Sequence, residues 1–214
     1  MEYTKEENLA YNIHLIKTKK FKKNCIKINF KSLINKEEIT YRNMLINVLL
    51  ESTKNYPSKR LLDIKSEELY GVNVSANTSI SGNYNIISFD TSFLNSKYTE
   101  ECMLEETIKY FLEFIFNPNV DDGKFDTNSF NKAKNILLED LDTFKDNPRR
   151  YAVAKCYEAM DKDSSIALNG VGYLEDLKGI NEKNLYEYYK KVLNSDTVDI
   201  FIIGDKFRFR YKMG

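Results

Sequence analysis

The segment from Lys36 to Leu50 carries apolar residues on two opposite helical faces, and this constrains the fold more than any other feature. One face, at spacings of three, four, seven and eight residues, holds Tyr41, Met44, Leu45, Val48 and Leu49. The other face holds Ile39, Asn43, Ile46, Asn47 and Leu50. A helix with this pattern needs packing partners on both sides. We therefore predict a helix that lies inside a layered domain.

Alternation of apolar and polar residues with a period of two predicts strands before and after this helix along the chain. The predicted strands cover residues 12–16, 25–31, 72–79, 84–93 and 198–203. We interpret the first two as a hairpin. Its basic connection favours a solvated hairpin end over an anion-binding patch. Ser81-Gly82-Asn83 is the expected turn between the third and fourth strands, and the last strand is expected to close the sheet.

Further helices are predicted by the period of 3.6 residues and by capping signals. They cover residues 58–70, 101–116, 128–144, 148–160 and 181–193. Gly71 is expected at the C′ position of the first of these, and Asn147-Pro148 is a helix start signal. Strands and helices are segregated along the chain, so the predicted fold class is α+β, a mostly antiparallel sheet covered by helices on one face. We expect a single domain over residues 1–205.

The composition argues against several classes of function. The 214 residues include 32 basic and 32 acidic side chains, and a net charge of zero argues against a nucleic-acid or anionic-membrane partner. No run approaches about 18 apolar residues, so no membrane span is expected. The charged start, Met1–Glu7, lacks the apolar region of a signal peptide. Cys25, Cys102 and Cys156 are widely spaced, which predicts reduced thiols in a cytoplasmic protein and neither a disulfide framework nor a zinc ribbon.

Candidates for independent enzyme chemistry are few. The chain has one histidine, His14, so a mechanism that needs two imidazoles in one protomer is excluded. On its predicted strand we expect His14 to be a partly exposed surface residue. Cys102 and Cys156 have no predicted histidine partner for nucleophilic catalysis. Gly170-Val171-Gly172 favours a turn over a phosphate-binding loop.

Four local patterns, taken in order, carry a family resemblance. Thr53–Ser58 fits a T-x-x-[YF]-P-S turn, and Leu69–Gly71 with Ala76–Ser79 fits a glycine followed by an A-x-T-S edge strand. Ile136–Asp140 fits a V-L-x-E segment on a later helix, and residues 174–205 fit a characteristic domain ending. Together they resemble one repeat of the insulinase/pitrilysin metallopeptidase family, and the resemblance covers most of the chain.

The resemblance implies where a zinc site would lie and which of its groups are missing. Active members carry H-x-x-E-H, in which two histidines bind zinc and the glutamate is the general base. Counting back from the turn places Asn43 and Asn47 at the histidine positions and Ile46 at the glutamate position. Glu139 falls at the third ligand position, and Lys132 replaces a supporting glutamate, where its positive charge opposes metal binding. A solvated or paired carboxylate is the favoured interpretation of Glu139.

The chain is therefore expected to be a degenerate zinc-peptidase homologue with no catalytic residue, metal or cofactor of its own. The family commonly works as pairs of homologous domains that enclose a chamber, and one half can lack zinc. The chain resembles a bacterial non-peptidase branch of the family. The resemblance implies a subunit that pairs with an active HxxEH homologue or a second repeat, helping to bind an extended peptide or protein substrate. A role in maturing or modifying a cytoplasmic protein is implied in the same way.

The expected peptide-binding route is strand addition along an edge strand, at Ser75, Ala76, Asn77 and Thr78. An edge strand kept polar only to prevent aggregation remains an alternative. A second alternative for the whole chain is a purely structural core subunit with no peptide ligand, whose chamber is filled by side chains. Residues 206–214 do not resemble the family's continuation, so we expect a first half with a non-family tail. Such a half would expose the surface that meets its second repeat, and we expect it to self-associate.

Overall fold

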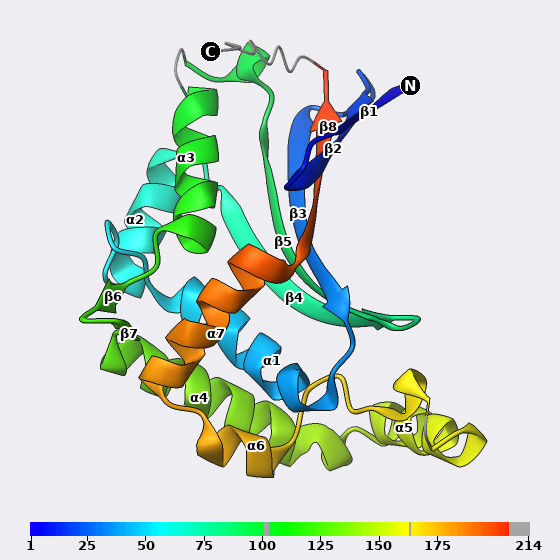
Figure 1. The fold of residues 1–214 in the computed structure, drawn as a ribbon. Helices are drawn as coiled ribbons and strands as arrows, with labels where there is room; N and C mark the ends of the chain where they lie inside the picture. Colours follow the sequence, from blue (N-terminus) through cyan, green and yellow to red (C-terminus); the bar gives the residue numbers. More distant parts are fainter. Residues whose placement is uncertain (101–102, 163, 206–214) are drawn as a thin grey trace.

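A six-stranded sheet with helices on one face forms the frame of the protein in the computed structural model, which describes residues 1–100, 103–162 and 164–205 (Figure 1). The strands are β1 (Glu2–Glu7), β2 (Tyr11–Lys17), β3 (Lys23–Leu33), β4 (Asn73–Ser81), β5 (Tyr84–Leu94) and β8 (Thr197–Gly204). Their order is β1-β2-β8-β3-β5-β4, and all neighbours are antiparallel except β2 and β8. The predicted α+β class and mostly antiparallel sheet are confirmed.

The hairpin predicted for residues 12–16 and 25–31, which form β2 and β3, is wrong, because β8 lies between these two strands. β8 pairs in parallel with β2 and antiparallel with β3, which sets Ile200 beside both Ile13 and Ile28. Two strand spacings amount to roughly 10 Å, a distance that the short connection after Lys17 can cross as easily as one spacing. The last strand therefore fills the middle of the sheet, where its apolar side chains have neighbours on both sides, and it does not close an edge.

The alternation predicted for β3 is present. Ile26, Ile28 and Phe30 are buried beneath the helices, whereas Lys27 and Lys31 point to the helix-free face and are half-buried. Antiparallel pairing with β5 sets Phe89 opposite Ile28 and continues the apolar layer. The sheet therefore has one apolar face and one mixed face.

The two-faced helix predicted from the sequence is α1 (Lys36–Glu51), and it is covered on both sides. It packs on β4 and β5 and also contacts α4 (Thr127–Asp142), α6 (Leu174–Gly179) and α7 (Glu182–Ser195). Buried residues come from both of its faces: Ile39, Met44, Leu45, Ile46, Val48 and Leu49. The Asn35 side chain accepts a hydrogen bond from the Glu37 amide at 3.1 Å and begins the helix. The expectation drawn from the apolar pattern is confirmed.

The remaining elements complete the helical layer. The helices are α2 (Lys59–Glu68), α3 (Met103–Phe116) and α5 (Pro148–Met160), joined by a small β6–β7 pair (Val120–Asp121 and Lys124–Phe125) and by the 3-10 turns η1 (Ser96–Tyr98), η2 (Thr143–Asp146) and η3 (Ser165–Ala167).

The capping signals are largely confirmed. Asn147 caps α5 as predicted by accepting from the Arg150 amide at 3.0 Å. Gly71 lies one position further from the helix than predicted, because Leu69 is the C-cap residue of α2 and Tyr70 takes the C′ position. Tyr70 and Gly71 both have positive φ, at 62° and 70°.

Two sequence-based expectations fall outside the described residues. These are the state of Cys102 and the non-family tail over 206–214. Cys25 and Cys156 are free thiols, and burial raises the pKa of Cys25. Within the described ranges, no helix is both long enough and apolar enough to cross a bilayer.

Candidate functional site

The positions of the degenerate motif and the predicted edge strand line the same cleft, whose volume is about 670 Å³. Asn43, Ile46 and Asn47 reach it from α1, and residues 76–80 of β4 form one wall. Side chains of α4, α5 and the segment 165–171 complete the lining. In Figure 1 these elements converge below the sheet, where β4, α1, α4 and α5 meet. The fold thus brings the motif positions on α1 next to residues 76–80 of β4, although α2 lies between them in the sequence.

Asn43 connects three elements around the cleft. Its side-chain amide donates to the Ile39 carbonyl at 2.9 Å and to the Gly170 carbonyl at 2.8 Å, and its oxygen accepts from the Thr78 hydroxyl at 2.7 Å. These bonds use both amide hydrogens and tie α1 to β4 and to the loop before α6. Asn43 is therefore a structural link and has no free donor for a ligand.

Asn47 lies one helical turn further along the same face. It is half-buried, and its side chain forms no hydrogen bond with any described residue. A carboxamide is neutral and offers both a donor and an acceptor, the pair that a peptide backbone also presents. Ile46 between them is 7% exposed and has no group that could accept a proton. This cleft can offer hydrogen bonds to a ligand, but it lacks a general base at the expected position.

The two charged positions named by the resemblance lie elsewhere on α4. Lys132 and Glu139 are exposed and are not among the residues that line the cleft. Asp140 lines it instead, since successive residues of a helix point about 100° apart. Asp140 forms a loose ion pair with Arg150 of α5, at 3.8 Å. Within the described residues, no three His, Cys, Asp or Glu side chains gather as a metal site would require.

The outer edge of β4 is open. A two-residue hairpin turn, in which Gly82 has a φ of +57°, closes on the Ser81–Tyr84 pair. Pairs with and without hydrogen bonds alternate from there, so Asn77 and Ser79 direct their backbone groups to β5. Just beyond the ends of β3 and β5, the Asn95 amide donates to the Lys22 carbonyl at 2.9 Å. Odd-numbered residues of β5 therefore bond to β3 and even-numbered ones to β4, which fits this alternation. The backbone amides of Ala76 and Thr78 therefore face away from the sheet, and among the described residues no backbone group pairs with them.

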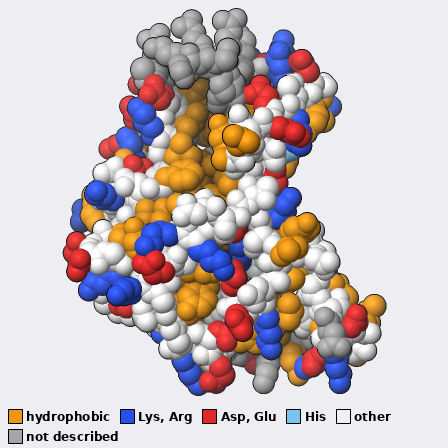
Figure 2. All heavy atoms as spheres, viewed as in Figure 1, with side chains coloured by type: hydrophobic (Ala, Val, Ile, Leu, Met, Phe, Trp, Pro, Cys, Tyr) orange, Lys and Arg blue, Asp and Glu red, His pale blue; other side chains and the backbone are white. Residues whose placement is uncertain are grey.

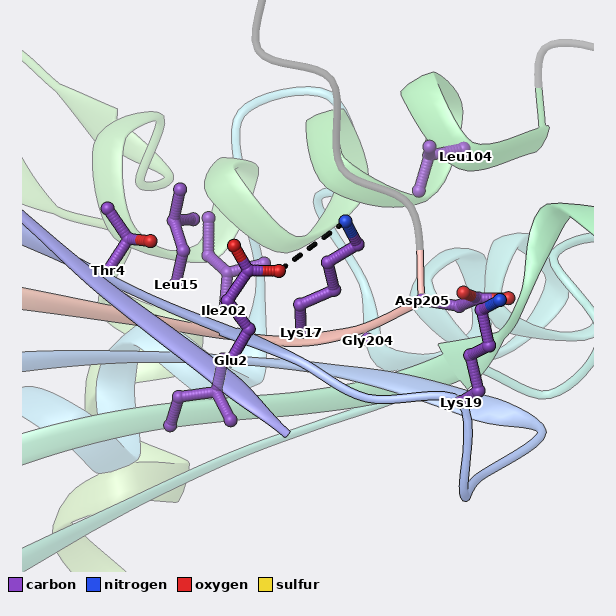
Figure 3. A pocket seen from close by; sticks show the side chains of 10 residues that line it. Glu2, Thr4, Leu15, Lys17, Lys19, Leu104, Ile202, Gly204 and Asp205 are labelled. Carbon is purple, nitrogen blue, oxygen red and sulfur yellow. Dashed lines mark ion pairs between the residues drawn. The ribbon is translucent and has the colours of Figure 1, made fainter.

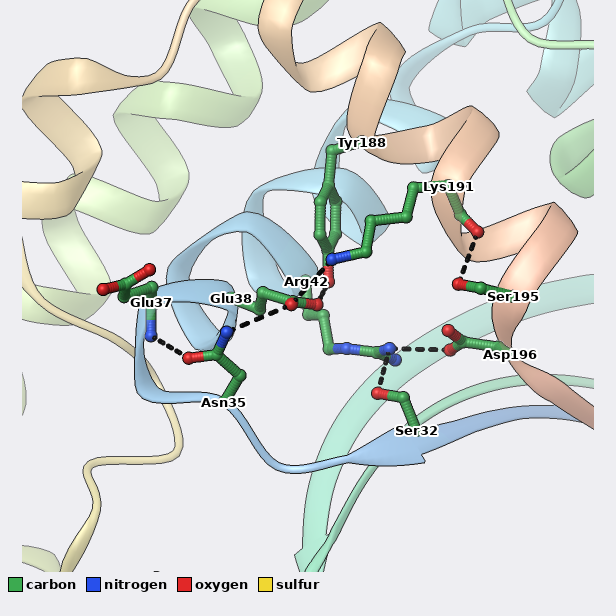
Figure 4. A network of polar contacts seen from close by, with 9 residues as sticks. All are labelled: Ser32, Asn35, Glu37, Glu38, Arg42, Tyr188, Lys191, Ser195 and Asp196. Atoms are coloured by element: carbon green, nitrogen blue, oxygen red, sulfur yellow. Dashed lines mark hydrogen bonds and ion pairs between the residues drawn. The ribbon is translucent and has the colours of Figure 1, made fainter.

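A buried ion pair holds α1 beneath the cleft (Figure 4). The Arg42 side chain, 1% exposed, donates to Asp196 at 2.6 Å and to Ser32 at 2.5 Å, and so joins α1 to the end of α7 and to β3. Burial raises the pKa of Asp196, and the Arg42 guanidinium opposes that shift. Arg42 precedes Asn43, so this pair fixes the start of the cleft-lining part of the helix.

A second polar group lies beside this pair. Glu38 accepts from Tyr188 and from Lys191, each at 2.8 Å. Burial raises the pKa of Glu38, but the hydrogen bonds from Lys191 and Tyr188 outweigh burial and leave the pKa below its ordinary value. These bonds tie the first turn of α1 to α7.

His14 lies on the helix-free face of the sheet, away from the cleft. Its ring stacks on Phe201 at 4.3 Å between centroids and contacts the Tyr3 hydroxyl at 2.8 Å. Asp199 lies 3.5 Å from its other ring nitrogen. Burial raises the pKa of Asp199, and hydrogen bonds from Asn12 and His14 lower it to a net value below the ordinary one. The side chain of His14 is 13% exposed, which agrees with a partly exposed strand residue.

A larger hollow, about 850 Å³, lies between the start of α3 and the ends of β1, β2 and β8 (Figure 3). Figure 2 shows apolar side chains gathered in the hollow on this side of the molecule. Leu15, Leu104 and Ile202 line it, and the Glu2–Lys17 ion pair, at 3.6 Å, lies at its rim. None of the site residues predicted from the sequence lines this hollow. The smaller cleft is therefore the candidate site.

Known proteins are similar to this chain in sequence and in structure. No protein-family model matches the chain. The chain is similar to the probable inactive metalloprotease YmfF of Bacillus subtilis, with 29% identity over 205 residues, 94% of this chain and 48% of that protein.

Two solved structures are similar to the whole chain. A conserved protein from Enterococcus faecalis has a TM-score of 0.89 and 27% identity, covering 96% of this chain and 49% of that one. A peptidase M16 inactive domain from Pseudomonas fluorescens has a TM-score of 0.73 and 15% identity, covering 97% and 48%. The chain thus spans about half the length of the relatives that it matches. The resemblance inferred from the four local patterns agrees with these findings, since the B. subtilis relative is described as a probable inactive metalloprotease and the Pseudomonas structure as an inactive peptidase domain.

Proposed function

We propose that the chain is a degenerate insulinase-type domain that binds an extended peptide along β4 without cleaving it, as its similarity to a probable inactive metalloprotease and to the fold of an inactive M16 peptidase domain supports. The peptide adds as a further strand to the open edge, and Asn47 offers its carboxamide to the peptide backbone. Backbone pairing of this kind needs no particular side chain from the peptide. The observation that carries the proposal is that the open edge of β4 and the degenerate motif line one cleft.

The cleft has the size and openness that this role needs. A volume of about 670 Å³ lies in the range of known ligand sites, about 300–1,000 Å³. A purely structural core subunit would be expected to fill this space with its own side chains. The open cleft, together with backbone groups of Ala76 and Thr78 that face away from the sheet, favours the peptide-binding role.

The proposed partner is a second insulinase-type domain. The chain covers 48% of the B. subtilis relative and 49% of the E. faecalis structure, so those proteins contain about as much chain again. In this proposal the second domain is either an active HxxEH homologue or a second repeat. The complex would hold a peptide or protein substrate in a cytoplasmic maturation or modification step. Co-purification with quantitative mass spectrometry tests the pairing.

Substitution Ala76→Pro tests the edge-strand route. Proline removes a backbone amide that faces the free edge, whereas the ladder between β4 and β5 keeps its donors. The probe is a fluorescein-labelled peptide, Thr-Gln-Thr-Leu-Thr-Gln-Thr, followed by fluorescence anisotropy. Loss of one backbone hydrogen bond should weaken its binding about three- to tenfold.

Lys5→Pro is the matched control. Lys5 lies on β1, the opposite edge strand, and its amide also faces outward, because the Asn8 amide bonds to the Tyr11 carbonyl and sets the alternation there. This substitution should leave peptide affinity unchanged. A version of the probe that is N-methylated at alternate residues gives the same test with the protein untouched. Equal affinity of Ala76→Pro and the unsubstituted chain for the probe would rule out strand addition at β4.

A further inference from the structure

The lining of the cleft combines apolar side chains with carboxamides, the hydroxyl groups of Thr78, Ser79 and Ser165, and one ion pair. Apolar side chains of the lining come from α1, α4, η2, α5 and the loop before α6, and they include Ile46, Leu137, Phe144, Val153, Tyr157 and Val171. The charged residues in the lining, Asp140 and Arg150, pair with each other at 3.8 Å. A charged ligand group would meet no unpaired opposite charge among the described lining residues, so its desolvation would be uncompensated.

The pleat of β4 decides which ligand side chains meet this lining. Ala76 and Thr78 point toward the helices, as the hydrogen bond from the Thr78 hydroxyl to Asn43 at 2.7 Å shows. A strand added beside β4 follows the same pleat, with neighbouring side chains about 5 Å apart on each face. Every second side chain of a bound peptide therefore enters the apolar part of the cleft, and the others point to the helix-free side.

The far wall of the cleft presents apolar side chains to solvent. Within the described residues α5 has no buried side chain. Val153 is 46% exposed and Tyr157 is 43% exposed, and both line the cleft. An apolar group placed between this wall and α1 would remove these surfaces from water, which stabilises a complex in proportion to the area buried.

We propose, building on the proposed function, that the cleft selects extended peptides with an apolar side chain at the inward-facing position. That side chain lies against Ile46 and between α4 and α5, where the degenerate motif has left neither a metal ligand nor a charged base. The ligand class is an uncharged, apolar strand segment. The outward-facing positions of the peptide carry no such requirement.

A peptide series on the full chain tests the selection. The host is Thr-Gln-Thr-Leu-Thr-Gln-Thr, in which a register shift of one residue moves the single leucine from one face of the added strand to the other, so that it can point inward. Replacing this leucine with alanine should weaken binding about tenfold, and replacing it with lysine or aspartate should weaken it more than about tenfold. The same replacements at the next position, which faces outward, should change affinity less than about threefold.

Val153→Glu tests the location of the receiving surface. A carboxylate at this lining position should weaken binding of the leucine peptide and strengthen binding of the lysine peptide, so that the preference between them falls at least about tenfold. Ala152→Glu is the matched control, because Ala152 is exposed on α5 one residue away and does not line the cleft. It should leave the preference unchanged.

The outcomes separate this inference from the proposed function. If leucine and lysine peptides bind equally well and both lose affinity on Ala76→Pro, strand addition stands and apolar selection is wrong. If the preference exists but Val153→Glu leaves it intact, the receiving surface is not this cleft. If no peptide of the series binds the chain, both the proposed function and the inference fail.

Discussion

The buried ion pair beneath the cleft gives the sharpest prediction for stability. Asp196→Asn removes the carboxylate that faces Arg42 at 2.6 Å, while both side chains remain almost fully buried, at 3% and 1% exposure. The Arg42 Nε and Nη1 groups already have no hydrogen-bond partner among the described residues, so Ser32 cannot compensate the whole charge. Breaking a buried pair by removing one partner costs about 3–5 kcal/mol, because an uncompensated charge stays inside.

This cost is large enough to measure by thermal unfolding. For a domain of this size, 1 kcal/mol lowers Tm by about 2–4 °C, so Asp196→Asn should lower Tm by about 6–20 °C. The double substitution Arg42→Met with Asp196→Leu removes both charges and should recover most of the loss. Glu175→Gln is the control, since Glu175 pairs with Lys178 at 2.9 Å while both side chains are exposed, and it should cost no more than about 1 kcal/mol.

A small effect of Asp196→Asn, below about 1 kcal/mol, would refute this reasoning. It would mean that the pair does not hold α1 in place. The same result would weaken the account of the cleft, because Asn43, Ile46 and Asn47 take their positions from this helix.

Two further predictions concern Glu38, in the first turn of α1, and Gly172, in the loop that packs against Thr40 of the same helix. The hydrogen bond from Lys191 helps to hold the pKa of Glu38 below its ordinary value of 4.5, so the stability it contributes is complete above that value and is lost as pH falls through the folded pKa. In urea unfolding below about pH 5, the unsubstituted chain should lose stability faster than Glu38→Gln, and parallel pH profiles would contradict this. Gly172→Ala should destabilise the fold by about 2 kcal/mol or more, because its Cβ would lie 2.6 Å from the Thr40 hydroxyl at a φ of +107°. Gly179→Ala, with nothing within 4 Å of its Cβ, should change stability by less than about 1 kcal/mol, and equal effects of the two in thermal unfolding would argue against the strained loop.

Local patterns predicted most of the elements but not their pairing. The two-faced pattern of α1 and the cap at Asn147 depend on residues within a few positions of one another, and the structure has both. The place of β8 depends on pairing with strands more than 160 residues earlier in the chain, which no local period encodes. β1 was missed because Glu2–Glu7 has no apolar alternation, as expected for an exposed edge strand that relies on pairing with β2.

The site was predictable only in part for the same reason. The spacing of Asn43 and Asn47 shows that they share a helix face, and the edge strand follows from the resemblance. The hydrogen bonds that Asn43 accepts from Thr78 and donates to Gly170 join residues 35 and 127 positions apart, so no local pattern predicts them. The lining role of Asp140, one residue after Glu139, depends on how α4 is rotated about its axis, and a motif match does not settle that rotation.

The central claim is that carboxamides and an aliphatic side chain have replaced the zinc ligands and the base of a peptidase, and metal analysis of the purified full chain tests it most directly. After equilibration with zinc and removal of the excess, elemental analysis should find no stoichiometric zinc. The same sample should not cleave a fluorogenic peptide. One zinc ion per chain that is lost on Asn47→Ala would contradict the account, because it would place a working metal site in the cleft where we propose that a peptide binds.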